Sequence, residues 1–315
     1  MHARALSIAA LTLGLITALP AAAADKVLDR TFQVAAGGRL RVDLDAGRVV
    51  VTGTDRPQVV VRLSARGTER ELAKLEWSAE KDAAGVAVTS KRDRTLGWLG
   101  WFNGDANVVA SIEVPREYNV ELYTSGGGIE LRGIDGDALG RTSGGRLQIE
   151  AVRGKVEMRT SGGGVTLKSV QGPVSVQTSG GSIQASDLEG GLRAHTSGGS
   201  IRLDRVSGPI EVHTSGGSID VDLVGDNQGI VARTSGGSIN LRIPSSIAGT
   251  LNASTSGGRV KSELPVTIGE SGDSVLRGTI NGGGPEIMAR SSGGSISIAS
   301  RDARAAPSPE ARGPE

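Results

Sequence analysis

The side chains best able to do chemistry are scarce in this sequence, which has three histidines and no cysteine. His195 and His213 lie 18 residues apart, and each directly precedes the tetrapeptide Thr-Ser-Gly-Gly. Two imidazoles without a nearby cysteine or an assured carboxylate make a poor metal site. No recognisable nucleophile completes a Ser-His-Asp arrangement with either histidine. We therefore expect no catalytic residues, no metal and no cofactor.

Basic residues recur at the same place in the pattern as these two histidines. The residues that directly precede successive Thr-Ser-Gly-Gly motifs are Arg141, Arg159, Gln177, His195, His213 and Arg233. If the motifs stack, these side chains form one column with like groups about one strand spacing apart. Our hypothesis is that the column binds an extended anion, such as an acidic glycan or a lipopolysaccharide core. The alternative is a solvated edge column that has no ligand.

Aromatic residues form a second candidate surface, because Trp98, Trp101 and Phe102 lie within five residues and alternate with glycines. An exposed aromatic loop could contact a protein partner, a sugar ring or a lipid interface. The same rings could instead plug the N-terminal mouth of a stacked fold. The sequence leaves both interpretations open.

Composition limits the architecture that can position these residues. The chain has 315 residues and 48 glycines but only seven aromatic residues, none of them after Tyr123. A core built from large side chains is therefore not expected beyond that point. The absence of cysteine excludes disulfides, thiol chemistry and attachment through a lipidated cysteine.

Residues 1–24 resemble a secretory signal peptide, with Arg4 near the start, an apolar stretch over 5–19, and small residues before Asp25. Cleavage would leave an extracytoplasmic chain, periplasmic, secreted or at the cell surface, without a transmembrane span. It would also remove Arg4, leaving 34 basic residues against 34 acidic ones. Nucleic acid is therefore not an expected partner.

A repeat governs the second half of the chain. Thr-Ser-Gly-Gly begins at Thr124, Thr142, Thr160, Thr178, Thr196, Thr214, Thr234 and Thr255, and Ser-Ser-Gly-Gly begins at Ser291. With the threonine as position one, positions six, eight, eleven, fifteen and seventeen are mostly apolar, and position thirteen is glycine in five successive repeats. The alternation is typical of two short strands joined by tight turns.

The pattern predicts an all-β fold, a β-solenoid resembling a parallel β-helix with about 18 residues per coil. Glycines would supply positive φ at the corners, and the threonine and serine hydroxyls would satisfy corner backbone groups. We expect repeats over 124–300 and a disordered tail over 301–315. The period breaks near Asn281, after which one short strand is expected.

Residues 25–123 are predicted to form an irregular β cap; a separately folded β domain is the alternative. Strand patterns cover residues 31–34, 39–44, 48–52, 58–63, 85–90, 107–114 and 119–123. A short helix is expected after Thr68, which has capping-box spacing with Glu71, and Leu72, Leu75 and Trp77 could face the sheet.

Several motifs together resemble the bacterial putative-adhesin family of β-strand-repeat proteins. They are the leader, the run Gly37-Gly38-Arg39-Leu40-Arg41-Val42, the Val114-Pro115 strand end and the serial Thr-Ser-Gly-Gly-x-Ile. The resemblance covers roughly residues 30–300. It implies an envelope or surface β-solenoid and transfers no residue-level site.

The function expected is that of a non-catalytic, adhesin-like scaffold that interacts with an envelope polysaccharide or an envelope protein. One alternative is a structural protein that self-associates end to end, since imperfect caps would leave open sheet edges. The other is a carbohydrate-active β-helix enzyme, which would need acidic or basic groups that converge in a cleft. The sequence does not indicate the oligomeric state.

Overall fold

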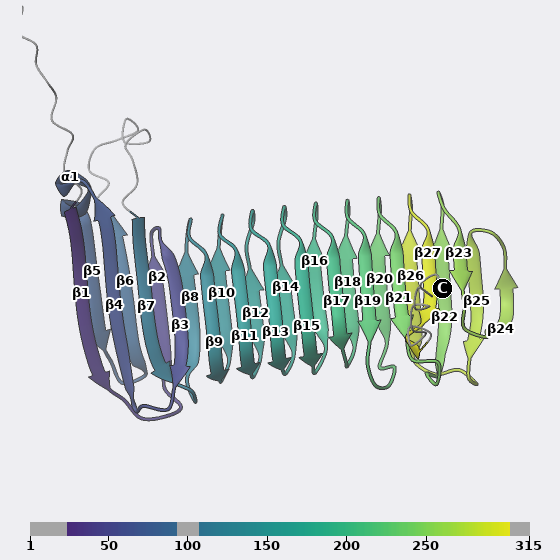
Figure 1. Cartoon of the computed structure of the whole chain (residues 1–315), viewed down its shortest axis with the longest axis horizontal. Coiled ribbons are helices and arrows are strands. Elements are labelled where there is room, and N and C mark those ends of the chain that lie inside the picture. The colour runs from purple at the N-terminus through teal and green to yellow at the C-terminus, as the bar shows by residue number, and fades with distance from the viewer. Residues whose placement is uncertain (1–23, 93–106, 303–315) are drawn as a thin grey trace, which may run out of the picture.

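The computed structural model describes residues 24–92 and 107–302, and these form two long β-sheets that lie face to face (Figure 1). In spatial order the first sheet contains β1 (Ala24–Gln33), β4 (Gln58–Gly67), β7 (Asn107–Pro115), β3 (Arg48–Thr54), β9 (Ile129–Asp135), β11 (Leu147–Arg153), β13 (Val165–Gln171), β15 (Ile183–Glu189), β17 (Ile201–Val206), β19 (Ile219–Leu223), β21 (Ile239–Ile243), β27 (Ile296–Ser300) and β23 (Val260–Ser262). The second contains β24 (Thr267–Ser271), β25 (Val275–Ile280), β22 (Gly249–Thr255), β26 (Glu286–Ser291), β20 (Ile230–Thr234), β18 (Ile210–Thr214), β16 (Leu192–Thr196), β14 (Val174–Gln177), β12 (Val156–Arg159), β10 (Ala138–Thr142), β8 (Asn119–Thr124), β2 (Arg39–Leu44), β6 (Gly85–Arg92) and β5 (Leu75–Lys81).

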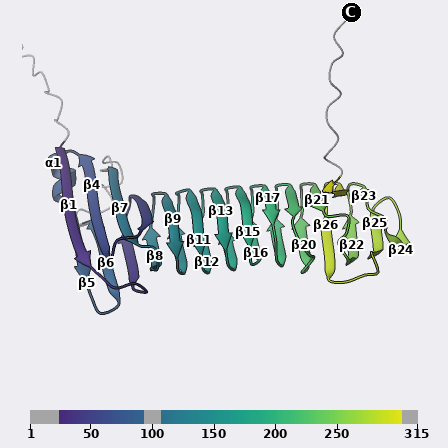
Figure 2. The same cartoon turned by 60° about the horizontal axis from the view of Figure 1, so that its bottom comes forward.

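Each repeat contributes one strand to each sheet, and successive repeats pair in parallel. Leu147 in β11 pairs with Val165 in β13, and Val156 in β12 pairs with Val174 in β14. Both pairs are 18 residues apart, so one repeat is one complete coil. The predicted β-solenoid is confirmed, and Figure 2 shows its coils as a regular row.

The core lies between the two sheets and consists of aliphatic side chains in register. In one coil, Ile183, Ala185 and Leu188 of β15 face the same interior as Leu192 and Ala194 of β16, and all are at most 4% exposed. Each fully buried aliphatic side chain of this size contributes about 1.5–3 kcal/mol. A narrow interior of this kind is filled without aromatic rings.

The Thr-Ser-Gly-Gly corners depend on glycine for a different reason from the one the sequence suggested. A Cβ on Gly199, at position four, would lie only 2.2 Å from the carbonyl oxygen of Gly181 in the preceding coil. The corner glycines do not have positive φ, so the expectation of left-handed turns was wrong there. It holds at position thirteen from the second repeat onward, where Gly154 has a φ of 144° and Gly172 a φ of 130°, but not at Gly136 in the first.

Position ten forms a second left-handed column that the sequence pattern does not reveal. Its members after Gly133 are not glycines, and their φ values are 54° for Ala151, 54° for Ser169, 55° for Asp187 and 52° for Arg205. A non-glycine residue in this region is uncommon and costs about 1 kcal/mol or more. The bend reverses the side-chain alternation, so positions eight and eleven can both face the core.

The N-terminal region joins the row through parallel pairing in both sheets. Strand β2 pairs with β8, and β3 pairs with β9. Strands β2 and β3 form one coil. Strands β6 and β7 come later in the chain but stack on the outer side of the β2/β3 coil. Antiparallel strands β1, β4 and β5 complete this end. The domain boundary at residue 123 stays a prediction.

Helix α1 (Glu69–Ala73) lies at this end and has the predicted capping box. The Thr68 hydroxyl accepts a hydrogen bond from the Glu71 backbone N–H, while the Glu71 side chain accepts one from the Thr68 N–H. Leu72 is buried. Leu75 and Trp77, which were expected to belong to the helical segment, instead lie in β5.

The C-terminal end corrects the expectation of one short strand after Asn281. Two strands follow, β26 and β27, and they insert as a complete coil. Strand β26 pairs with β20 on one side and β22 on the other, and β27 lies between β21 and β23. The last coil in the sequence is therefore not the last in space (Figure 1).

The leader segment, apart from Ala24, and tail residues 303–315 lie outside the described residues. Trp98, Trp101 and Phe102 also fall outside them. Within the described ranges, no helix has both the length and the apolar character needed to cross a membrane.

Candidate functional site

The polar column predicted before the Thr-Ser-Gly-Gly motifs exists as a row of in-register residues along the second sheet. From one end to the other its members are Asp43, Tyr123, Arg141, Arg159, Gln177, His195, His213, Arg233, Arg290 and Ser254. Each occupies the outward position before the inward residue that opens a corner. The five basic or imidazole residues identified from the sequence are therefore stacked by the fold itself.

Part of this column lines a groove of about 500 Å³, which we name the basic groove. Its lining comprises His195, His213, Arg233, Arg290, Thr214, Thr234, Thr255, Ser215, Ser235, Ser254, Ser256, Ser291 and Ser292. The second residue of each corner contributes an exposed hydroxyl, so a row of serines runs beside the cations. The lining contains no carboxylate.

Arg290 is the functional candidate that sequence reasoning missed. It enters the column because β26 inserts beside β20, which places Arg290 opposite Arg233. The signal was present, since Arg290 precedes Ser-Ser-Gly-Gly as Arg233 precedes Thr-Ser-Gly-Gly. The spacing of 57 residues between them concealed their adjacency.

The arginines of the groove form no ion pair, whereas most other arginines of the described chain pair with a carboxylate. The Arg233 guanidinium lies 3.4 Å from the His213 Nε2 and donates to the Met288 sulfur at 3.1 Å. Within the parts of the chain that the structure describes, Arg141, Arg233 and Arg290 form no ion pair. Arg159 differs, because its guanidinium lies 3.2 Å from a Glu157 carboxylate oxygen.

His213 is half-buried and its imidazole is held neutral by its surroundings. Burial is the main cause that lowers its pKa, and the adjacent Arg233 and His195 lower it further. Glu211, whose carboxylate lies 3.5 Å from the His213 Nε2, acts in the opposite direction. The ring centroids of His195 and His213 are 6.4 Å apart. At pH 7 the His213 imidazole therefore adds little positive charge to that of Arg233 and Arg290.

The two histidines do not form part of a larger ligand cluster. No group of three or more histidine, cysteine, aspartate or glutamate side chains comes together within the described ranges in a way that could hold a metal ion. The nearest charged neighbour on one side of His213 is Arg233, which would repel a cation.

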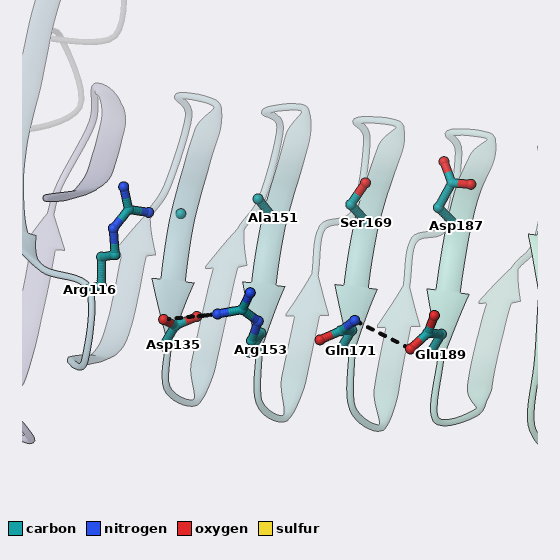
Figure 3. Close-up of a pocket in the computed structure, with 9 residues that line it drawn as sticks. Arg116, Asp135, Ala151, Arg153, Ser169, Gln171, Asp187 and Glu189 are labelled. Atoms are coloured by element: carbon teal, nitrogen blue, oxygen red, sulfur yellow. Dashed lines mark hydrogen bonds and ion pairs between the residues drawn. The ribbon is translucent and has the colours of Figure 1, made fainter.

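A second groove, on the first sheet, contains charged side chains most of which pair with one another or with residues beside the groove. This paired trough has a volume of about 540 Å³ and is lined by Arg116, Gly133, Asp135, Ala151, Arg153, Ser169, Gln171, Asp187 and Glu189 (Figure 3). Arg153 pairs with Asp135 at 3.3 Å, and Asp187 pairs with Arg205 at 2.7 Å. Figure 3 shows Arg153 directed toward Asp135, and Gln171 directed toward Glu189, each pair in adjacent coils.

The family model Toastrack DUF4097 matches residues 38–299 of the chain. The chain belongs to this Toastrack family. That assignment confirms the resemblance drawn from the serial Thr-Ser-Gly-Gly motifs and agrees with the solenoid architecture. No curated protein matches the chain.

Three solved structures are similar to this Toastrack chain at low identity. A putative adhesin from Bacteroides fragilis is 14% identical, covering 87% of this chain and 97% of its own, with a TM-score of 0.36. A putative lipid binding protein from Parabacteroides distasonis is 13% identical, covering 87% and 96%, with a TM-score of 0.36. A putative cell adhesion protein from Clostridium sporogenes is 12% identical, covering 88% and 100%, with a TM-score of 0.26.

Proposed function

We propose that the protein is a non-catalytic extracytoplasmic scaffold, adhesin-like in character, that holds an acidic envelope polysaccharide in the basic groove. The observation that carries the proposal is that Arg233 and Arg290 lie in register without an ion pair, whereas most arginines of the described residues on both sheets have one. Arg153 and Arg205 are neutralised by carboxylates in adjacent coils, whereas Arg233 and Arg290 have no such partner in the residues that the structure covers. Cations left without a partner are available to an anionic ligand.

The serine row supports a sugar as the ligand. Ser215, Ser235 and Ser292 present exposed hydroxyls beside the arginines, and a hydroxyl both donates and accepts hydrogen bonds. A sugar chain offers hydroxyls of the same kind together with carboxylates for the guanidinium groups. The mature chain is formally neutral, so attraction would act locally along the groove and weaken as salt rises.

The lining of the groove supports binding rather than cleavage. Glycosidases typically use two carboxyl groups about 5–9.5 Å apart, one on each side of the scissile bond. The basic groove has no carboxylate in its lining. The leader sequence supports a location outside the cytoplasm, where an envelope polysaccharide would be met.

The test is a paired substitution that removes charge without disturbing the coil. Arg233→Gln combined with Arg290→Gln is compatible with the fold because Gln177 already occupies the same column. We expect retention on immobilised polygalacturonate to fall at least tenfold, since a hydrogen bond to a charged group contributes about 1.5–3 kcal/mol. Retention on neutral dextran provides the baseline.

Arg153→Gln combined with Arg205→Gln is the matched control, because it removes the same charge from two arginines that pair with carboxylates of the paired trough. This control should retain wild-type binding to polygalacturonate. Equal losses in the two double variants would show that only overall charge matters and would overturn the proposal. Unchanged retention of the Arg233→Gln, Arg290→Gln variant would also overturn the proposal. If that variant still captured envelope proteins, the result would favour a protein partner instead.

A further inference from the structure

Resting on the proposed function, we infer that the ligand is a linear polyanion that lies along the long axis of the solenoid and bridges two cationic stations in one column. The C-terminal station is Arg233 and Arg290, in the basic groove. The N-terminal station is Arg141, which forms no ion pair in the described chain, together with Arg159 in the next coil, which is paired with Glu157. Between the stations lie Gln177, His195 and His213, one from each intervening coil.

The N-terminal station has a groove of its own. A hollow of about 180 Å³ is lined by Asp43, Leu44, Tyr123, Thr124, Ser125, Arg141, Thr142 and Ser143. It has the same composition as the basic groove in two respects, an arginine without an ion pair in the described chain and serines from successive corners. Arg141 is exposed, so its guanidinium is accessible to a ligand.

The two stations are connected by a continuous polar surface. The second residue of every intervening corner is a serine, and its side chain is exposed: Ser161, Ser179, Ser197 and Ser215. No acidic residue interrupts the column between Arg141 and Arg290. Tyr123 and Ser254 flank the stretch from Arg141 to Arg290, so the cationic part of the column has defined limits.

The geometry selects the direction of the ligand. Stacked strands lie about 4.8 Å apart, so the four steps from Arg159 to Arg233 span about 19 Å and the six from Arg141 to Arg290 about 29 Å. The column is perpendicular to the strands and therefore parallel to the row of coils in Figure 1. Only an extended chain along that axis can contact both stations at once.

Bridging predicts a dependence on ligand length. A short oligomer occupies one station, whereas a chain longer than about 19 Å reaches the second station as an intramolecular event, which raises its overall affinity. The probes are galacturonate oligomers of graded length, measured by calorimetry on residues 25–315. We expect affinity to increase at least tenfold once the oligomer exceeds the span between the stations.

The decisive variant is Arg141→Gln combined with Arg159→Gln. It should abolish the increase for long oligomers while short oligomers bind the basic groove with wild-type affinity. Arg153→Gln with Arg205→Gln should change neither. A thermal melt of each variant establishes that the fold is retained.

Two different results would overturn the inference, and they are distinguishable. If short oligomers bind, and the N-terminal substitution leaves long-oligomer affinity unchanged, the polysaccharide does not bridge the stations although the proposed function survives. If oligomers of every length fail to bind, both the inference and the proposed function are wrong.

Discussion

At the scale of single residues, the opening threonine of each coil joins that coil to the one before it. Thr196 is fully buried, and its hydroxyl donates to the Gly181 carbonyl at 2.8 Å while accepting from the Gly199 N–H at 3.3 Å. In the inserted coil, Ser291 makes equivalent hydrogen bonds at 2.8 and 2.9 Å. The hydroxyl, not the methyl group, is therefore what this position requires.

Replacing Thr196 by valine should test this requirement, because the two side chains have nearly the same shape. The change leaves the Gly181 carbonyl and the Gly199 N–H without their partner, and we expect the free energy of unfolding to fall by about 1–3 kcal/mol. Urea denaturation measures the change. Thr196→Ser is the control, with an expected loss of no more than about 1 kcal/mol from one methyl group. Equal losses in the two variants would contradict the role of the hydroxyl.

The residues of the column show what the sequence can and cannot predict about a site. His195 and His213 lie one period apart, so their adjacency follows from the repeat length alone. Arg290 could not be placed in this way, because the coil that contains it returns to an earlier place in the row. The absence of carboxylate partners for Arg233 also depends on which side chains the stacking brings together, which the period does not specify.

At the scale of elements, two adjacent glycines in one corner have different roles. A Cβ on Gly199 would lie 2.2 Å from the Gly181 oxygen, closer than a Cβ approaches a non-bonded atom in real proteins. A Cβ on Gly198 would lie 3.4 Å from the nearest atom, the Gly180 oxygen, and so could be accommodated with little movement. The fourth position is where the backbones of successive coils make their closest approach.

We therefore predict opposite outcomes for two alanine substitutions in this corner. Gly199→Ala should push neighbouring coils apart and lower the free energy of unfolding by about 3 kcal/mol or more, as expected for a severe steric conflict. Gly198→Ala should lower it by less than about 1 kcal/mol. Denaturation of both variants in urea measures the difference. A milder effect for Gly199→Ala than for Gly198→Ala would contradict the close approach seen here.

The strands of the repeats were predictable because period-two alternation marks the inward positions directly. The left-handed bend at position ten was not predictable, since Ala151, Ser169, Asp187 and Arg205 share no chemical property that marks a positive φ. Their conformation is imposed by the ladder on both sides of the bend, whose hydrogen bonds offset the local cost. The positive φ at such a residue can be recognised only once the positions of the neighbouring coils are known.

At the scale of the whole molecule, the order of the coils is reversed near both ends. At one end β2 and β3 lie between the β6/β7 coil and the β8/β9 coil. At the other, β26 and β27 lie between the β20/β21 coil and the β22/β23 coil. The final coil is fastened by Arg301, which donates to Asp222 at 2.8 Å, and by Asp302, which accepts from the Ser245 N–H at 2.9 Å.

Removing the inserted coil should separate the two parts that it joins. A chain that ends at Asn281 lacks β26 and β27, so β22 and β23 lose their only parallel neighbours within the described structure. We expect amide hydrogens over residues 249–280 to exchange rapidly, while those in coils 124–214 stay protected. Hydrogen exchange measures both regions. A chain that ends at Asp302 is the control. Unchanged protection over 249–280 in the shorter chain would show that the inserted coil does not hold β22 and β23 in place.

The end reversals mark the limit of what the repeat could predict at this scale. The 18-residue period establishes which residues stack when neighbours in sequence are neighbours in space. It says nothing about pairs such as Ile230 and Ile287, which are brought together from distant parts of the chain. Their pairing is a choice among chemically similar coils, and the period alone does not distinguish them.

The reversed coil order at both ends has a consequence for how such a protein can change over evolutionary time. Because each reversal involves only the coils at its own end, an internal coil could be gained or lost by an in-frame duplication or deletion without rebuilding either end. Each such event would alter the reach of the molecule by one strand spacing, about 4.8 Å. Under the proposed mode of binding, a coil gained or lost between the two stations would also change the length of the shortest glycan that can contact both.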